Sequence, residues 1–188
     1  NPTVFTADIE FAGQVVKLNV TDPVITAGVS IKKTGYAQTM NNNVMRWTVS
    51  GVRNDSTTSL QSFYWRDTLP TDAVRLTRLV TGTYSTTQTY KVTFTTNLNS
   101  QWRTAYDNLS TAKNYTLDMS SAALGLASNE YVTQFMLSFG IVPAGFHQLT
   151  NATVDAQTLY ALTNGYKFTN KADVGGLLGG NWVQSIAR

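Results

Sequence analysis

Short runs in which apolar and polar residues alternate follow one another along most of the chain, with turn-forming residues between them. Alternation with a period of two is typical of a strand that buries one face. Repeated short strands separated by turn signals favour an antiparallel sandwich or barrel, so we predict an all-β fold. The runs include TVFTADIEF, VVKLNVT, VSIKKTG, VMRWTVSGV, SLQSFYWRDTLP, AVRLTRLVTGTY, TYKVTFTTN, YVTQFMLSFGIVP and YKFTNKADVG.

One segment departs from this alternation. In SQWRTAYDNLSTA, Trp102, Tyr106 and Leu109 lie at i, i+4 and i+7, which is the spacing of an apolar helix stripe. Ser100 can cap the start of such a helix. We therefore predict one short helix in a loop between strands. The segment DAQTLYALTNG is compatible with either a helix or a strand.

Composition and charge exclude several classes of partner and site. The net charge of +3 is spread without a basic run, so nucleic acid is not an expected partner. The chain has no cysteine, which excludes disulfides and thiolate metal sites. His147 is the single histidine and is expected to be a solvated loop residue, so we expect no metal and no cofactor. No apolar stretch reaches the length needed to cross a membrane, and no membrane insertion is expected.

The two ends of the chain suggest that it is a piece of a longer protein. It opens on NPTVFT without a methionine, and its last residues give no clear boundary. We predict one β-sandwich domain over residues 23–188. The strand pair expected within residues 1–22 is either the remnant of a preceding domain or a hairpin added to this one.

Three predicted strands each bring one polar side chain to the face that should be buried: Lys33, Asp67 and Asn170. Lys32 and Arg66 then point outward. The inward sets are Val29, Ile31 and Lys33 in the first strand, Phe63, Trp65 and Asp67 in the second, and Tyr166, Phe168, Asn170, Ala172 and Val174 in the third.

An amine, a carboxyl and a carboxamide in a dry site can react. Burial drives Lys33 toward its neutral, nucleophilic form and Asp67 toward its protonated form. The protonated acid can polarise the carbonyl of Asn170, so that the amine attacks it and ammonia leaves. The product is a Lys–Asn isopeptide bond. The alternatives are a buried Lys33–Asp67 ion pair with Asn170 as its hydrogen-bond partner, a strand end that leaves Lys33 in solvent, and a bulge that turns Lys32 inward instead.

Four motifs in this order, VSIKKTG, FYWRDTLP, FGIVPAGF and YKFTNKADVGG, resemble the repeated immunoglobulin-like domains of Gram-positive cell-wall-anchored surface proteins, including collagen-adhesin and pilin sandwiches. The resemblance covers roughly residues 24–188. It implies an immunoglobulin-like antiparallel β-sandwich. It also implies an isopeptide bond with Lys33 as nucleophile, Asn170 as acceptor and Asp67 as assisting acid. No L-P-x-T-G sorting signal is present in the chain, so the wall anchor is expected outside this fragment.

The resemblance predicts a structural or adhesive stalk module of an extracellular, cell-wall-anchored protein. Its expected partners are host extracellular matrix, a glycan, or sister domains of the same chain. It is not expected to be an enzyme beyond a single, self-directed bond formation. The alternative is a carbohydrate-binding β-sandwich module of a secreted enzyme, which predicts an exposed aromatic row on one sheet face.

Overall fold

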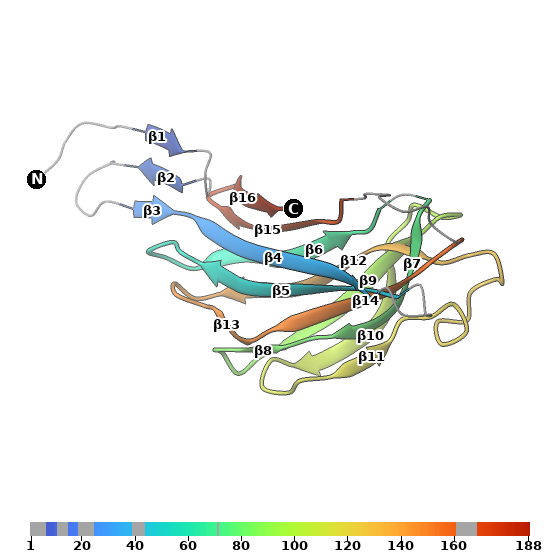
Figure 1. The fold of residues 1–188 in the computed structure, drawn as a ribbon. Helices are drawn as coiled ribbons and strands as arrows, with labels where there is room; N and C mark the ends of the chain where they lie inside the picture. The colour runs from blue at the N-terminus through green and yellow to red at the C-terminus, as the bar shows by residue number, and fades with distance from the viewer. Residues whose placement is uncertain (1–6, 11–14, 19–24, 39–43, 71, 161–168) are drawn as a thin grey trace, which may run out of the picture.

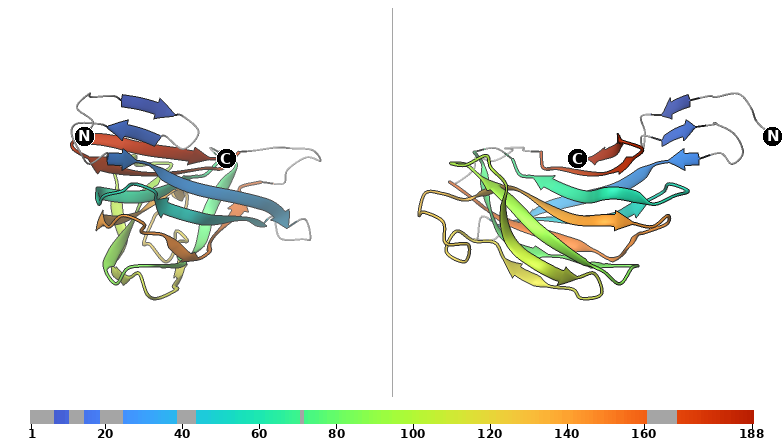
Figure 2. Two further views of the ribbon diagram at one scale, coloured as in Figure 1. Left: turned by 90° about the vertical axis from the view of Figure 1, so that its left-hand side faces the viewer. Right: turned by 180° about the vertical axis from the view of Figure 1, so that it is seen from behind.

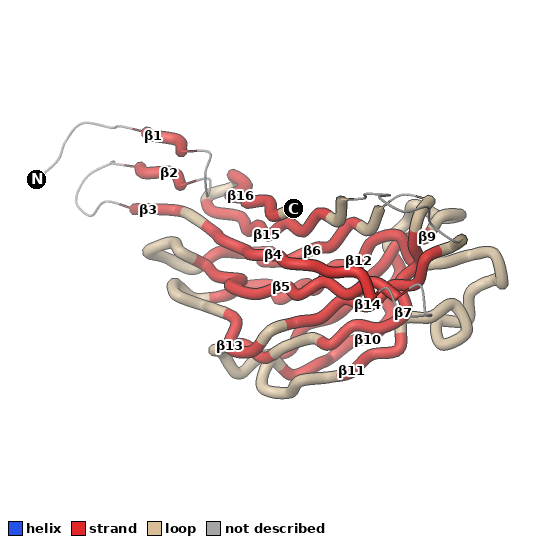
Figure 3. Tube along the Cα trace, in the orientation of Figure 1, coloured by secondary structure: helices blue, strands red, loops and turns tan. Residues whose placement is uncertain are grey.

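The computed structural model describes residues 7–10, 15–18, 25–38, 44–70, 72–160 and 169–188. Within these ranges the chain forms antiparallel strands joined by turns, and no helix occurs in them (Figure 3). The predicted all-β class is confirmed. Two large sheets lie face to face and make a β-sandwich (Figure 1).

The larger sheet has six strands in the order β10-β9-β12-β6-β15-β16, in which every neighbouring pair is antiparallel. Its central strand β6 therefore lies between β12 and β15. The bounds are β6 Leu60–Thr68, β9 Thr89–Thr96, β10 Arg103–Ser110, β12 Val132–Val142, β15 Lys171–Leu178 and β16 Asn181–Ala187.

The second sheet has five strands in the order β11-β7-β14-β5-β4, and β4 lies against β15 and β16 of the first sheet. A two-stranded ribbon, β13-β8, completes this part of the fold. The bounds are β4 Val29–Gln38, β5 Val44–Asn54, β7 Val74–Val80, β8 Thr83–Tyr84, β11 Thr116–Asp118, β13 Gln148–Thr150 and β14 Ala152–Thr158.

A third, small sheet of order β1-β2-β3 stands at one end of the sandwich (Figure 2). Its strands β1 and β2 pair antiparallel, as expected for a hairpin, and β3 leads directly into β4. The division between residues 1–22 and 23–188 stays a prediction. The bounds are β1 Ala7–Glu10, β2 Val15–Leu18 and β3 Ile25–Ala27.

The inner faces of the two large sheets bury one continuous core in which aromatic side chains are prominent. Trp65 packs edge-to-face on Phe135 with ring centroids 5.5 Å apart, an arrangement that adds about 0.5–1.5 kcal/mol to the area buried. The indole N–H of Trp65 donates to the hydroxyl of Tyr84 at 2.9 Å, and that hydroxyl donates to the carbonyl of Thr81 at 2.8 Å. The polar atoms carried by these large rings are thus paired, as burial requires.

The predicted short helix is wrong, because its segment forms strand β10. Two register shifts against β9, one between Thr104 and Tyr106 and one between Tyr106 and Leu109, each insert an extra residue into β10. Bulges lengthen the spacing between residues of one face from two to three or more, and this imitates a helical stripe. The ambiguous segment begins as a strand, since β14 runs to Thr158, and its residues 161–165 lie outside the described part of the chain.

Candidate functional site

Lys33 lies on the inner face of β4, as its strand alternation predicted. Its side chain is 1% exposed, whereas Lys32 is exposed to solvent. A register shift between β4 and β5 does occur, but the extra residue is in β5, where Gly51 has a φ of +65°. The alternation within β4 is therefore unbroken, and Lys33 is the lysine that the fold turns inward.

Asp67 and Asn170 come to the same place from the opposite sheet. Asp67 is on the inner face of the central strand β6, directly opposite Ala172 of β15. Asn170 precedes Ala172 by two residues and so lies on the same face as a diagonal neighbour of Asp67. Both are buried. Tyr166 and Phe168, the other residues predicted inward here, lie outside the described part of the chain.

The three side chains are in contact within the described structure. The Nζ atom of Lys33 is 2.6 Å from Oδ2 of Asp67, and the Nδ2 atom of Asn170 donates to the same oxygen at 3.3 Å. Two acceptors in this cluster, Oδ1 of Asp67 and Oδ1 of Asn170, are buried without a hydrogen-bond partner among the described residues. A proton on the carboxyl of Asp67 would supply the donor that these oxygens lack.

Burial shifts both ionisable groups toward neutrality. Desolvation lowers the pKa of Lys33 and outweighs the attraction and hydrogen bond of Asp67, which raise it. Desolvation likewise raises the pKa of Asp67, against the opposing effect of Lys33 and the hydrogen bond from Asn170. Both directions favour a neutral amine beside a protonated acid.

A second buried acid of the sandwich, Asp155, shows the contrast. Burial alone would raise the pKa of Asp155, but the hydrogen bonds from Arg46 and Arg78 lower it by more than burial raises it. The pKa therefore falls below the ordinary value of an aspartate. Guanidinium groups cannot give up their protons in a protein, so this carboxylate stays ionised. Asp67 is paired instead with a lysine, whose proton can be transferred.

An aromatic ring covers the amine of Lys33. The ring of Trp47, on the neighbouring strand β5, has its centroid 5.6 Å from Nζ. It lies so close to Gly35 that a Cβ atom there would come within 2.2 Å of its Cδ1 atom. Gly35 therefore leaves the space that the indole fills, and the indole keeps water from one side of the amine.

His147 lies at the end of the sandwich, where its backbone forms an isolated β-bridge with Arg53. Its Nδ1 atom is 2.9 Å from the carbonyl oxygen of Gly145. His147 is half-buried, whereas we expected it to be solvated. No group of three or more His, Cys, Asp or Glu residues suited to a metal ion occurs in the described ranges.

The alternation of the strands did not point to a second cluster, on the outer face of the six-stranded sheet. There Asp173 is buried and accepts hydrogen bonds from Tyr64 and Arg66. The sequence did contain a signal for this cluster. Asp173 is next to the inward-facing Ala172 in β15 and so faces outward, and Tyr64 and Arg66 face outward from the neighbouring strand β6. Reading it required knowing that β6 and β15 are neighbours.

Fold and site together define the class of the chain. It is an antiparallel β-sandwich domain whose two sheets are linked across the core by a buried amine, carboxyl and carboxamide. Among the described residues, no helix is long and apolar enough to cross a membrane.

Compared with protein families and with curated proteins, the sequence matches none. Among solved structures, it is similar to ACE19, the collagen binding subdomain of the Enterococcus faecalis surface protein ACE, with a TM-score of 0.34 and 10% identity over 85% of this chain and 95% of that one. It is also similar to the serine-rich repeat protein Srr2 of Streptococcus agalactiae, with a TM-score of 0.34 and 12% identity over 98% of this chain and 56% of that one. Clostridium perfringens delta-toxin matches with a TM-score of 0.27 and 10% identity, over 96% of this chain and 91% of the toxin. Likeness at this level assigns neither a family nor a ligand to the chain.

Proposed function

We propose that this chain is an immunoglobulin-like structural and adhesive module of an extracellular bacterial surface protein, cross-linked internally by an isopeptide bond between Lys33 and Asn170. The observation that carries the proposal is the dry cluster in which Asp67 contacts both partners. The resemblance of four sequence motifs to those of Gram-positive surface domains supports the extracellular setting. The chain has no cysteine, so no disulfide can stabilise it, and an isopeptide bond would provide a covalent cross-link in place of one.

The bond can form without any external reagent. The Lys33 ammonium passes a proton to Asp67, which gives a neutral amine and a protonated acid. A half-turn of the Asn170 carboxamide brings its carbonyl oxygen to the position now held by Nδ2, where the acid donates to it. The amine nitrogen attacks the carbonyl carbon, the C–N bond of the carboxamide breaks, and its nitrogen leaves as ammonia after taking up the proton released by the amine. Asp67 then gives the proton that it took from Lys33 to the ammonia, which departs as ammonium, so the carboxylate is regenerated and one turnover completes the chemistry.

The position of the bond fits a structural role. Lys33 belongs to the five-stranded sheet, whereas Asn170 leads into β15 of the six-stranded sheet. The bond would therefore join the two layers of the sandwich. An ion pair in the same place would be costly to bury and would add little net stability, so the cluster is better explained by reaction than by electrostatic stabilisation.

The intact mass of the purified chain tests the proposal directly. We expect a mass short of the calculated value by one ammonia, and a peptide that joins the segments around Lys33 and Asn170 after proteolysis. In the Asn170→Ala variant the mass should equal that variant's full calculated value. A parent chain that folds and yet keeps its full mass would overturn the cross-link and leave a buried ion pair.

The rate of bond formation should depend on pH with a maximum. The reactive form carries one proton on the Lys33–Asp67 pair; acid adds a second proton and charges the amine, and base removes the proton from the acid. Burial raises the pKa of Asp67 from 3.8 and lowers that of Lys33 from 10.5. The acidic and the alkaline decline of the rate should therefore both occur between these two pH values. Chain kept unfolded in denaturant can be refolded at set pH and its mass followed with time. A rate that climbs steadily into strong alkali would contradict the neutral-pair mechanism.

A further inference from the structure

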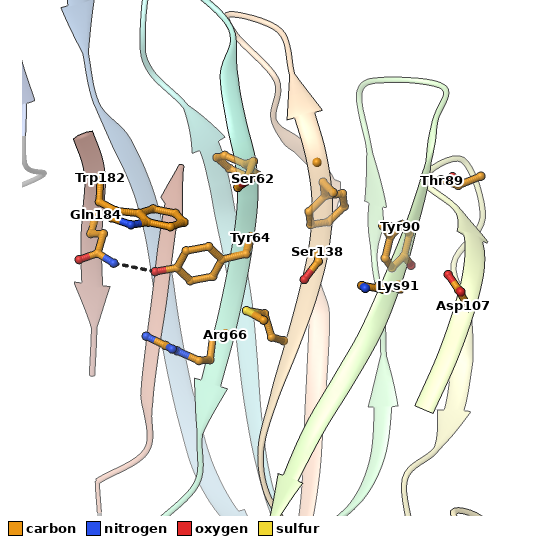
Figure 4. Close-up of a pocket in the computed structure, with 14 residues that line it drawn as sticks. Ser62, Tyr64, Arg66, Thr89, Tyr90, Lys91, Asp107, Ser138, Trp182 and Gln184 are labelled. Carbon is orange, nitrogen blue, oxygen red and sulfur yellow. Dashed lines mark hydrogen bonds between the residues drawn. The ribbon is translucent and has the colours of Figure 1, made fainter. Parts of the chain in front are cut away.

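A groove crosses the outer face of the six-stranded sheet, on the side away from the Lys33 cluster (Figure 4). Its volume is about 640 Å3, within the range of about 300–1,000 Å3 that is usual for small-ligand sites. Side chains from five strands contribute to it. The lining residues that face outward include Ser62, Tyr64, Arg66, Lys91, Asp107, Ser138 and Trp182.

One wall of the groove is an aromatic platform. Trp182 on β16 is 52% exposed, and its indole packs edge-to-face on the ring of Tyr64 with centroids 5.9 Å apart. The Tyr64 ring lies across Gly175 of β15, where a Cβ atom would approach it to 2.8 Å. The glycine is therefore what allows the tyrosine ring to lie across β15, where its neighbour Trp182 packs against it.

Hydrogen bonds hold this platform rigidly. The Tyr64 hydroxyl donates to buried Asp173 at 2.9 Å and accepts from Gln184 at 2.9 Å. Arg66 donates two hydrogen bonds, of 2.9 and 2.8 Å, to the same carboxylate. Its guanidinium carbon lies 5.4 Å from the centre of the Tyr64 ring. Burial and the neighbouring Asp173 raise the pKa of Tyr64 to about 12, so the phenol keeps its proton. A preorganised surface of this kind loses little entropy on binding.

The floor of the groove is small, polar and irregular. Ser138 lies between the platform and the opposite wall, which Lys91 and Asp107 form (Figure 4). Register shifts between β6 and β12 place bulges at Ser62 and Gly140, and Ser62 holds a φ of +49°. A non-glycine residue in the left-handed region is strained, and such strain is common where a ligand is bound.

Charge and chemistry in the groove identify the class of ligand. Two cations, Arg66 and Lys91, are matched by two acids, Asp173 and Asp107, so the site has no net charge. An exposed tryptophan face offers a stacking surface for the C–H side of a pyranose ring. The serine hydroxyls beside it both donate and accept hydrogen bonds, as sugar hydroxyls require. We infer that this groove binds a neutral oligosaccharide, with Trp182 as its stacking platform.

This inference deepens the adhesive part of the proposed function, and it can fail independently of the cross-link. Biotinylated domain, made tetravalent on streptavidin to raise its avidity, would be applied to an array of neutral glycans, anionic glycans and triple-helical collagen peptides. A soluble form of any neutral glycan that binds would then be titrated calorimetrically. The intact mass of the same preparation reports separately whether the isopeptide bond is present.

We expect the parent to bind neutral glycans and Trp182→Ala to weaken the affinity by about tenfold or more, with part of it kept in Trp182→Phe. Ser138→Phe, which fills the floor and leaves the platform in place, should abolish binding. The matched controls Trp102→Ala, at an exposed tryptophan outside the groove, and Ile186→Ala, at an exposed residue of the same strand, should bind as the parent does. The inference is overturned if no neutral glycan binds, if Trp182→Ala and Ser138→Phe bind normally, or if only anionic glycans or collagen peptides bind.

Discussion

Replacement of Asn170 by alanine should lower the midpoint of thermal unfolding by about 10–20 °C. The proposed bond closes a loop of 137 residues (170 − 33), and closing a loop of that length stabilises a chain by about 5 kcal/mol in the chain-entropy model. A domain of this size loses about 2–4 °C for each kcal/mol. Differential scanning calorimetry of the parent and the variant measures the difference.

A double-mutant comparison separates the covalent bond from the contacts that Asn170 makes. Lys33→Met removes the same bond from its other end. If the bond is the common cause, the Lys33→Met and Asn170→Ala variants are both destabilised, and combining them costs little more than either alone. Stability losses that simply add would show that no bond joins the two residues.

Replacement of Asp67 by asparagine should stop the cross-link from forming on the time scale of preparation. Asparagine keeps the size of the side chain but cannot accept the proton of Lys33 or return one to the Asn170 carbonyl. Loss of a positioned acid–base group slows a reaction by about 10²–10⁴-fold. We expect the purified variant to have its full calculated mass, without the loss of ammonia expected of the parent.

Asp173→Asn is the matched control. Asp173 is also buried and is on β15, the strand next to that of Asp67, but its carboxylate faces outward and pairs with Arg66 and Tyr64. This variant should still lose one ammonia. Equal cross-linking in Asp67→Asn and the parent would exclude Asp67 from the reaction.

Strand alternation was sufficient to place the side chains of Lys33 and Asp67 on the inner faces of their strands. Lys33 and Asp67 each follow two inward apolar residues at intervals of two, and neither strand carries an extra residue between those positions and the site. The bulge that would have exchanged Lys33 for Lys32 is in the partner strand, at Gly51. Inward or outward orientation can be predicted from a sequence wherever a strand is regular over the residues that matter.

The sequence was misleading where that regularity fails. Because β10 contains two extra residues, Trp102, Tyr106 and Leu109 are separated by the same intervals as the apolar residues of a helix. A single sequence carries no reliable signal for such bulges. The groove could not be predicted for another reason. The groove is lined by Trp182, near the end of the sequence, and by Tyr64 and Lys91, which lie far from it in the sequence. Only the order of strands in the sheet brings these residues together.

The placement of Lys33 and Asn170 in opposite sheets also determines how the domain would respond to tension. With the bond formed, a pull applied across the chain bypasses the 136 residues from 34 to 169 (169 − 33). On the C-terminal side, the 18 residues of this sequence that follow Asn170 (188 − 170) can be drawn out, beginning with the edge strand β16. At about 3.3–3.6 Å per residue they release about 60 Å of length. Once these residues and those before Lys33 are extended, the domain would behave as an inextensible link, and the load would rest on covalent bonds rather than on sheet hydrogen bonds.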